Sequence, residues 1–157
     1  MFGRKKKSTV VVAPVTGKAI PITEVEDQVF RDKILGDGVA LVPEEDDFVA
    51  PCSGTVVQVA HTGHAICIES DDGLEILLHL GMDTVQLEGE GFVNHVKTGQ
   101  HVNAGDKLVT MDRAFVTEKG YQIVSPCIVT NLDAVKDISF QTGAVTHGET
   151  VIMQYSK

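Results

Sequence analysis

The sequence predicts an all-β protein, an antiparallel β-sandwich or barrel-sandwich hybrid with duplicated strand-turn corners and one or two short helices. Three observations support this: short runs of Val, Ile and Leu alternate with Gly, Asp and Asn, a proline-glycine phrase is repeated, and helix signals are sparse. The 157 residues, 43% hydrophobic and 22% charged, suit one globular domain with a substantial core. We expect this domain at 9–157, after a flexible basic leader at 1–8.

The repeated phrase is Val-Ala-Pro, with a glycine three residues after the proline. It occurs at 12–17 and 49–54, and a looser copy without the glycine occurs at 124–127. Proline cannot donate to a β-ladder, so it marks a strand start, an edge or a bulge, and a nearby glycine permits a turn. We interpret each copy as a corner between strands, which places strands at 18–22 and 55–60.

Eight further runs rich in Val, Ile and Leu have the length of strands. They lie at 39–42, 65–70, 74–80, 102–103, 107–111, 122–124, 128–130 and 150–154. Two segments are candidates for short helices, 115–119 and 132–138, the second with Asn131 as its N-cap. The three cysteines lack C-x-x-C spacing and are expected to be reduced core residues. They are Cys52, Cys67 and Cys127.

Charge is unevenly distributed. The formal net charge is −9, but four of the thirteen basic residues lie at 4–7. The segment 34–96 contains no Lys or Arg and twelve acidic residues. This pattern argues against binding of nucleic acid by the domain and favours encounter with a basic partner protein.

Nothing in the sequence predicts export or a membrane span. The leader is followed by a run too short for the apolar stretch of about 7–15 residues that a signal peptide requires. No apolar run approaches the ~20 residues that span a bilayer. We therefore expect a cytoplasmic protein, in which the basic leader is either a solvated tail or a weak contact with an anionic membrane surface.

Two of the six histidines, His64 and His79, flank a predicted hairpin whose turn lies at 71–73. Asp-Gly is a strong signal for a two-residue loop, and either two-residue loop would bring both rings onto one face, with Cβ atoms about 5 to 8 Å apart. A three-residue loop would place them on opposite faces. On one face, a neutral nitrogen of one ring could accept a group while the other ring donates a hydrogen bond.

The neighbouring residues suit such chemistry. Gly81 leaves room for an incoming group beside His79, and the hydroxyl of Thr62 could orient His64. Two histidines near carboxylates also raise the alternative of a zinc site. No third ligand has suitable spacing, so we expect no metal and no cofactor. A pair that merely caps the hairpin for solubility is the non-functional alternative.

Four motifs carry a resemblance to a known family. They are Thr-Gly-His-Ala at 62–65, His-Leu-Gly-Met-Asp-Thr-Val at 79–85, Gly-Glu-Gly-Phe at 89–92 and Leu-Gly-Asp-Gly-Val-Ala at 35–40. In order and spacing they resemble enzyme IIA (EIIA) of the glucose family of the bacterial phosphoenolpyruvate-dependent sugar phosphotransferase system. The similarity runs from about 12 to 152, nearly the whole chain.

The resemblance implies a phosphoryl relay. In that family the residue matching His79 is phosphorylated on Nε2 by the phosphocarrier protein HPr and passes the group to a cysteine of the EIIB domain of a sugar permease. The residue matching His64 donates a hydrogen bond to the phosphoryl group, and the one matching Thr62 holds that second ring. An apolar docking face rimmed by acidic residues is implied as well. Its expected members are Asp27, Val39, Gly81 and Asp83.

Carrier domains offer a competing interpretation. The phrases at 50–57 and 97–109 also resemble the corners of biotinyl and lipoyl carrier domains. Those carriers need a lysine at the hairpin tip, where this chain reads Thr-Met-Asp-Arg-Ala at 110–114. The resemblance therefore supports the fold and not the carrier function. A β-sandwich interaction module without chemistry is the third alternative.

Overall fold

The computed structural model describes residues 9–156, and this part of the chain contains fourteen strands, two short α-helices and three 3-10 helices. The strands are β1 (Thr9–Val12), β2 (Gly17–Pro21), β3 (Asp37–Pro43), β4 (Asp47–Val49), β5 (Gly54–Val59), β6 (Ala65–Ser70), β7 (Glu75–His79), β8 (Phe92–Asn94), β9 (His101–Val102), β10 (Lys107–Met111), β11 (Ser125–Val129), β12 (Asp137–Phe140), β13 (Gly143–Val145) and β14 (Val151–Ser156). The helices are α1 (Gln28–Arg31), α2 (Arg113–Glu118), η1 (Ile22–Glu24), η2 (Thr84–Leu87) and η3 (Leu132–Ala134).

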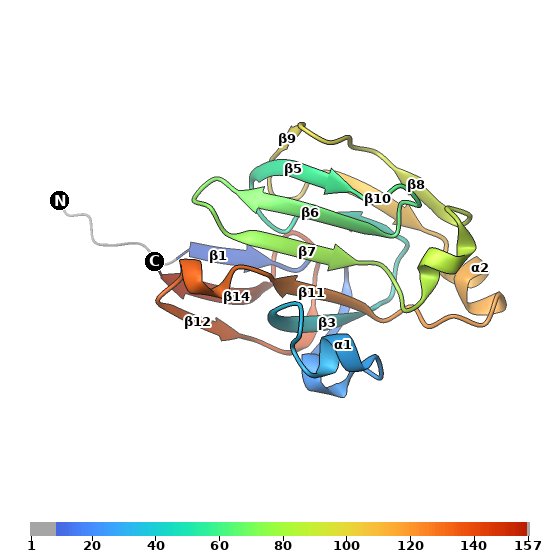
Figure 1. Cartoon of the computed structure of the whole chain (residues 1–157), viewed down its shortest axis with the longest axis horizontal. Helices are drawn as coiled ribbons and strands as arrows, with labels where there is room; N and C mark the ends of the chain where they lie inside the picture. Colours follow the sequence, from blue (N-terminus) through green and yellow to red (C-terminus); the bar gives the residue numbers. More distant parts are fainter. Residues whose placement is uncertain (1–8, 157) are drawn as a thin grey trace.

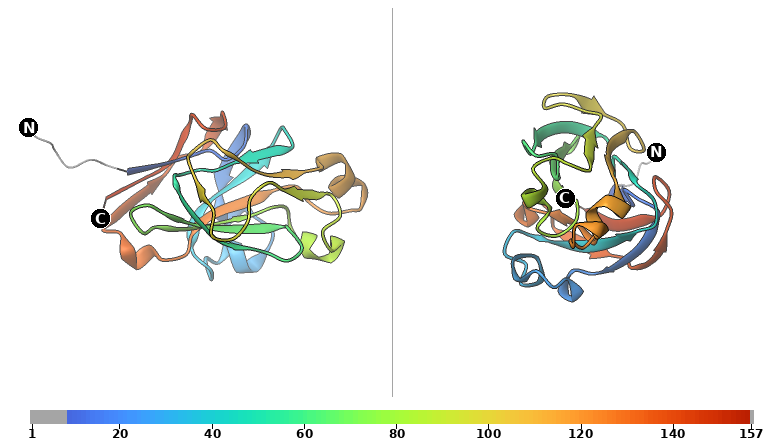
Figure 2. Two further views of the ribbon diagram at one scale, coloured as in Figure 1. Left: turned by 90° about the horizontal axis from the view of Figure 1, so that it is seen from above. Right: turned by 90° about the vertical axis from the view of Figure 1, so that its right-hand side faces the viewer.

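Three antiparallel sheets make up the fold (Figure 1). The largest has the strand order β13-β2-β3-β11-β7-β6-β5-β9, and the two smaller sheets are β1-β14-β12 and β4-β10-β8. Seen end-on, the sheets curve around a common interior without closing into a barrel (Figure 2). The predicted all-β sandwich with one or two short α-helices is confirmed. None of the helices in the described part of the chain has the length and apolar composition needed to cross a membrane.

The interior is filled from all three sheets. Among its largest buried side chains are Phe48 from β4, Leu108 from β10 and Ile152 from β14. A second, smaller cluster lies between η1, α1 and the large sheet, and includes Phe30 of α1 and Ile128 of β11. This second cluster holds α1 beside the C-terminal end of β7.

The first two Val-Ala-Pro phrases form corners, as predicted, and the corners bind each other. The N–H of Val12 donates to the carbonyl of Pro51 at 2.9 Å, and the N–H of Val49 donates to the carbonyl of Pro14 at 2.7 Å. These four residues occupy equivalent positions in the two phrases. The corners are therefore related by an approximate two-fold axis.

The same symmetry continues outside the corners. Ala13 donates to the carbonyl of Thr150 at 2.8 Å, and its equivalent, Ala50, donates to the carbonyl of Asp106 at 2.7 Å. The repeat in the sequence is thus a repeat in three dimensions. Each copy contributes one strand that ends at its valine, two residues before the proline, and one that begins at its glycine.

The interpretation of the third copy as a corner is wrong, because Ser125 and Pro126 open strand β11. Pro126 pairs with β3 but precedes the three residues of β11 that pair with β7. Its missing N–H therefore leaves no hydrogen bond unmade on the β7 side. The strand expected at 122–124 is not formed, since those residues lead into β11.

The helix expected at 132–138 is also wrong. Only η3 is helical there, and the chain then forms β12, in which Asp137 lies opposite Ser156 and Ile138 lies opposite Tyr155 of β14. Pairing with β14 overrides the weak local helix signal. The helix expected at 115–119 is found as α2. Cys52 and Cys127 are buried as expected, but Cys67 is half-buried.

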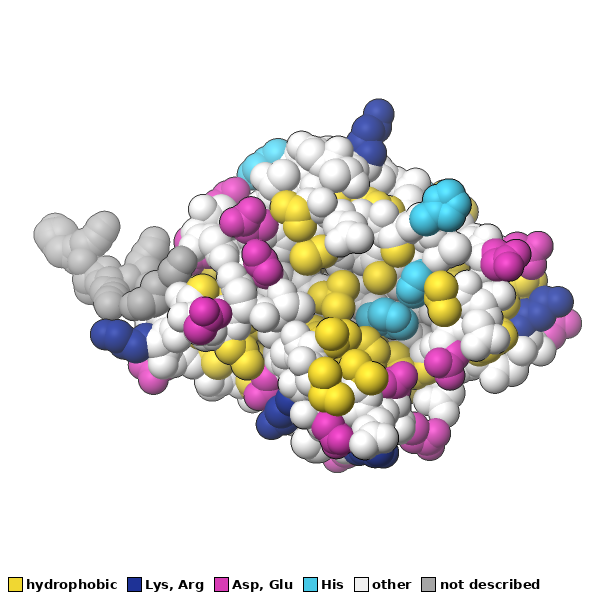
Figure 3. Space-filling model, in the orientation of Figure 1, with side chains coloured by type: hydrophobic (Ala, Val, Ile, Leu, Met, Phe, Trp, Pro, Cys, Tyr) yellow, Lys and Arg dark blue, Asp and Glu magenta, His cyan; other side chains and the backbone are white. Residues whose placement is uncertain are grey.

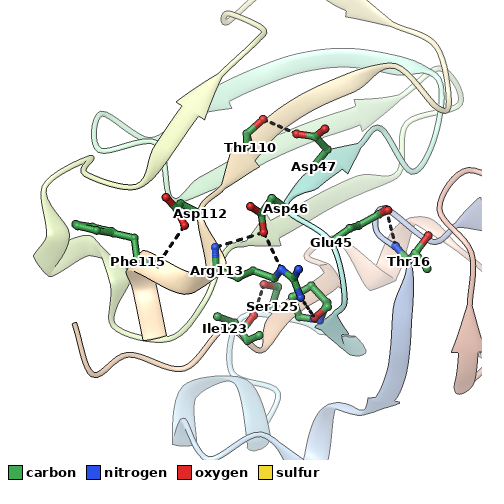
Figure 4. Close-up of polar contacts among 11 residues, drawn as sticks. Thr16, Glu45, Asp46, Asp47, Thr110, Asp112, Arg113, Phe115, Ile123 and Ser125 are labelled. Atoms are coloured by element: carbon green, nitrogen blue, oxygen red, sulfur yellow. Dashed lines mark hydrogen bonds and ion pairs between the residues drawn. The ribbon is translucent and has the colours of Figure 1, made fainter. Parts of the chain in front are cut away.

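The acidic turn between β3 and β4 is held by side-chain contacts with residues that are distant in the sequence (Figure 4). Asp46 accepts from Nε of Arg113 at 2.7 Å, at the start of α2. Asp47 accepts from the hydroxyl of Thr110 at 2.6 Å. Glu45 accepts from the N–H of Thr16 and also contacts His147. These three acidic side chains therefore fix the β3–β4 turn to the neighbouring segments that carry Thr16, Thr110 and Arg113.

Close backbone approach at Gly54 yields a stability prediction. A Cβ there would lie 2.2 Å from the carbonyl oxygen of Glu69, on the paired strand β6. Gly54→Ala should lower the free energy of unfolding by about 3 kcal/mol, because the β5–β6 ladder must separate to admit the methyl group. Gly99→Ala is the control, since Gly99 has a φ of +94° but open space around it. It should cost only about 1 kcal/mol in denaturant unfolding; equal losses would contradict the prediction.

Candidate active site

The β6–β7 hairpin has a three-residue loop, so the expected two-residue loop is wrong. Ala65 lies opposite His79, and Glu69 lies opposite Glu75. The residues between them alternate as the pleat requires: Ile66 and Leu78 are buried, whereas Cys67, on the same face as His79, is half-buried. His79 therefore projects from the outer face of the large sheet.

The two histidines nevertheless meet. Their ring centroids lie 5.1 Å apart with an interplanar angle of 76°. His64 precedes the first residue of β6 and lies in the turn that contains Gly63, whose φ is +76°. The direction of its side chain is therefore set by the turn and not by strand alternation. The expectation that the pair shares one face holds, for a different reason from the one expected.

A hydrogen bond fixes the tautomer of His79. Nδ1 lies 2.8 Å from the carbonyl oxygen of Gly81. A carbonyl can only accept, so Nδ1 carries the proton and donates it. In the neutral ring Nε2 then has a lone pair and no proton. The ring of Phe30 packs edge-on against His79, with centroids 5.2 Å apart.

His64 is held by its neighbour and by its own backbone. The hydroxyl of Thr62 lies 2.6 Å from Nδ1 of His64. The carbonyl of His64 accepts from the N–H of Leu80 at 2.7 Å. The second contact ties the turn before β6 to the residues that follow His79.

Burial lowers the pKa of both rings below the ordinary histidine value. For His79 this burial is the largest influence, opposed by the hydrogen bond to Gly81 and by the negative charges of Asp27 and Asp83. For His64 burial again comes first, followed by the charge of His79. Both rings are therefore neutral at neutral pH, the state in which a ring nitrogen without a proton has a lone pair available for attack.

The expected docking residues lie in different surroundings. Asp27 caps α1 by accepting from the N–H of Val29 at 2.9 Å, and Asp83 is exposed at the start of η2. Val39 is only 1% exposed and packs in the main core, so it cannot contribute a side chain to a surface. Gly81 is buried, and it holds His79 through its carbonyl instead of leaving space for a group.

Near the histidines the surface is apolar with an acidic edge (Figure 3). Exposed apolar side chains include Val29, Ile34, Leu35 and Val85, of which Ile34 is 66% exposed. A hollow of ≈ 310 Å³ includes the two expected acidic residues in its lining, which consists of Glu26, Asp27, Met82, Asp83, Gly120, Tyr121 and Gln122. Within residues 9–156, no three His, Cys, Asp or Glu side chains are grouped so that they could hold a metal ion.

Comparison with known families identifies the family of this chain. The family described as phosphoenolpyruvate-dependent sugar phosphotransferase system, EIIA 1, matches residues 9–153. The chain belongs to this family. EIIA proteins of this type are phosphotransferases that carry a phosphoryl group within the sugar phosphotransferase system, between HPr and the EIIB domain of a sugar permease.

Relatives of this EIIA protein span its whole length. A glucose-specific EIIA component from Bacillus cereus is 45% identical over 154 residues, covering 98% of this chain and 93% of the relative. One from Staphylococcus aureus is 40% identical over 157 residues, covering 98% and 95%. The solved structure of glucose permease IIA from Mycoplasma capricolum matches with a TM-score of 0.88 and 46% identity, over 94% of this chain and 96% of that one.

The lowered pKa of His79 in this EIIA protein makes its titration a test of the site. The midpoint of ring protonation, followed by NMR, should lie below the ordinary value of 6.5. Below 6.5 the unfolded chain then binds more protons than the folded chain, so stability should fall as the pH falls through this window. His79→Gln should weaken that dependence in urea unfolding. A midpoint at or above 6.5 would contradict the assignment of burial as the dominant influence.

Proposed function

We propose that this EIIA protein is a cytoplasmic phosphoryl carrier that is phosphorylated on Nε2 of His79. Phospho-HPr is the donor and a cysteine of the EIIB domain of a permease is the acceptor. The observation that carries the proposal is the hydrogen bond between Nδ1 of His79 and the carbonyl of Gly81, which leaves Nε2 with a free lone pair. Glucose is the proposed sugar, because the relatives from Bacillus and Staphylococcus are named glucose-specific.

Each of the two transfers, from HPr to His79 and from His79 to the cysteine, is a nucleophilic displacement at phosphorus. The lone pair of Nε2 attacks phosphorus, a bond from Nε2 to phosphorus forms, and the bond between phosphorus and the HPr histidine breaks. The proton on Nδ1 stays in its hydrogen bond with Gly81 throughout. In the next step the cysteine thiolate attacks phosphorus and Nε2 leaves with its electron pair. Such transfer asks mainly for in-line positioning and stabilisation of charge.

His64 supplies part of that stabilisation. When the hydroxyl of Thr62 donates to Nδ1 of His64, the neutral ring carries its proton on Nε2. With the ring centroids 5.1 Å apart, this Nε2–H is close enough to donate to a phosphoryl oxygen on His79. Thr62 therefore acts on the phosphoryl group through the orientation and tautomer of His64.

The surroundings of the pair favour brief contact with a basic partner. Apolar side chains such as Ile34 and Val85 supply contact area around the histidines. Asp27 and Asp83 place negative charge at the edge, where it attracts basic side chains without ion-pairing to the rings. Partners with this complementarity associate quickly and can separate quickly, as a relay needs.

Histidine variants test the relay directly. In a mixture of phosphoenolpyruvate, enzyme I and HPr, the protein should gain one acid-labile, base-stable phosphoryl group, and His79→Ala should gain none. His64→Gln should still be labelled, but onward transfer to an EIIB domain of a glucose permease should slow by about a hundredfold, because the glutamine amide cannot place its N–H where Thr62 holds that of the imidazole. Mass spectrometry of the intact protein and quenched-flow transfer assays measure the two steps. Normal labelling of His79→Ala would refute the assignment of the acceptor.

Charge at the edge of the site gives a second test. Asp83→Asn should slow phosphoryl transfer from HPr about fivefold at low salt and flatten its dependence on ionic strength, because it removes an attractive charge. Asp133→Asn is the matched control, since it changes net charge equally at an exposed position in η3, at the other end of the hairpin. If both variants slow the reaction equally, net charge and not the position of Asp83 controls the encounter.

A further inference from the structure

Two buried hydroxyls contact the turn that directly follows the candidate nucleophile, His79. The side chains of Thr84 and Ser125 are both 0% exposed, although each carries a polar group. Their hydrogen bonds go to backbone groups and not to the rings of the histidines. Both instead contact the turn at 80–82, which follows His79 and presents the carbonyl of Gly81 to Nδ1.

The two hydroxyls hold opposite ends of one peptide group. The hydroxyl of Thr84 donates to the carbonyl of Leu80 at 2.5 Å. The N–H of Gly81, in the same peptide group, donates to Oγ of Ser125 at 3.1 Å. With both its polar atoms bonded to buried side chains, this peptide cannot rotate without breaking a hydrogen bond in a dry environment, which is costly.

Ser125 is itself fixed by the sheet. It lies at the start of β11, between β3 and β7, and its hydroxyl donates to the carbonyl of Ile123 at 2.8 Å (Figure 4). Its proton is used in that bond, so Oγ can only accept from Gly81. A continuous series of hydrogen bonds therefore runs from Ile123 through Ser125 and Gly81 to Nδ1 of His79.

Packing also restricts the backbone of the turn at 80–82. Gly81 has a φ of +77°, and a Cβ there would lie 2.6 Å from Cγ2 of Thr84 and 2.9 Å from the carbonyl oxygen of Gln122. The N–H of Met82 donates to that same carbonyl at 3.0 Å. The direction of the Gly81 carbonyl is thus determined by packing and hydrogen bonds on both sides of the turn.

We propose that Ser125 and Thr84 are positioning residues for phosphoryl transfer: by holding the Leu80–Gly81 peptide they keep the Gly81 carbonyl on Nδ1 of His79, and so keep Nε2 unprotonated and correctly placed. This inference rests on the proposed role of His79. It adds a function for two residues that do not contact the phosphoryl group. Thr84 and Ser125 act on opposite ends of the same peptide, so loss of either should have the same effect.

Ser125→Ala tests the proposal. Loss of its hydroxyl should lower the fraction of His79 in the Nδ1–H form, read at equilibrium from ¹H–¹⁵N spectra of the imidazole rings. The rate of phosphoryl acceptance from phospho-HPr should fall about tenfold, because the nucleophile is misplaced for part of the time. Ser125→Thr keeps the hydroxyl and should restore both the tautomer and the rate.

Ser70→Ala is the matched control. The Ser70 hydroxyl is also buried, accepts from a backbone N–H, that of Leu74, and donates to an oxygen, that of Asp72, but at the far end of the same hairpin. Its loss should reduce stability as Ser125→Ala does, and should leave the His79 tautomer and the transfer rate unchanged.

Thr84→Val provides an independent variant, because valine keeps the shape of threonine and removes only the donor to Leu80. It should shift the tautomer in the same direction as Ser125→Ala, and it decides the question if Ser125→Ala does not fold. Unchanged His79 spectra and rates in the folded variants would overturn the proposal. The tautomer is measured without phosphorylation, so that failure is distinct from a failure of wild-type protein to be labelled on His79.

Discussion

The hydrogen bond from Nδ1 of His79 to the carbonyl of Gly81 is the constraint on which the site depends. A neutral imidazole has one proton and one lone pair, so committing the proton to a backbone carbonyl leaves the lone pair at Nε2. The bond needs a carbonyl in a fixed direction two residues after the end of β7. The surrounding fold supplies this through central strands of the large sheet, β7 and β11, and through the buried contacts of the turn.

Electrostatics at the site must satisfy two opposing demands. A basic partner is attracted by carboxylates, but carboxylates near a histidine raise its pKa and favour the protonated form, which cannot attack phosphorus. In this structure Asp27 and Asp83 do raise the pKa of His79, but burial lowers it more strongly. The acids lie at the edge and the ring lies against Phe30, so attraction of a basic partner and a neutral His79 ring are compatible.

Features encoded by particular residues could be predicted from the sequence, and features set by distant contacts could not. The corners at Pro14 and Pro51 were predictable because proline and glycine restrict the backbone locally. The length of the hairpin loop was not, because Asp72-Gly73 signals a two-residue loop, whereas the pairing of β6 with β7 leaves three residues in the loop. The contact of Ser125 with Gly81 could not be predicted, because the phrase at 124–127 says nothing of what the serine hydroxyl binds, and β11 brings it to the turn at 80–82 only in the folded chain.

The three-residue loop of the β6–β7 hairpin shows that strand alternation does not bring the two histidines together. In the observed register a regular strand would turn His64 away from His79, yet the rings are in contact because His64 lies outside β6. Its position depends on Thr62 and on the bond from Leu80 N–H to the His64 carbonyl. The next residue, Gly81, offers its carbonyl to Nδ1 of His79. Both rings are therefore attached to the same short turn, so a displacement of that turn would move the two imidazoles together.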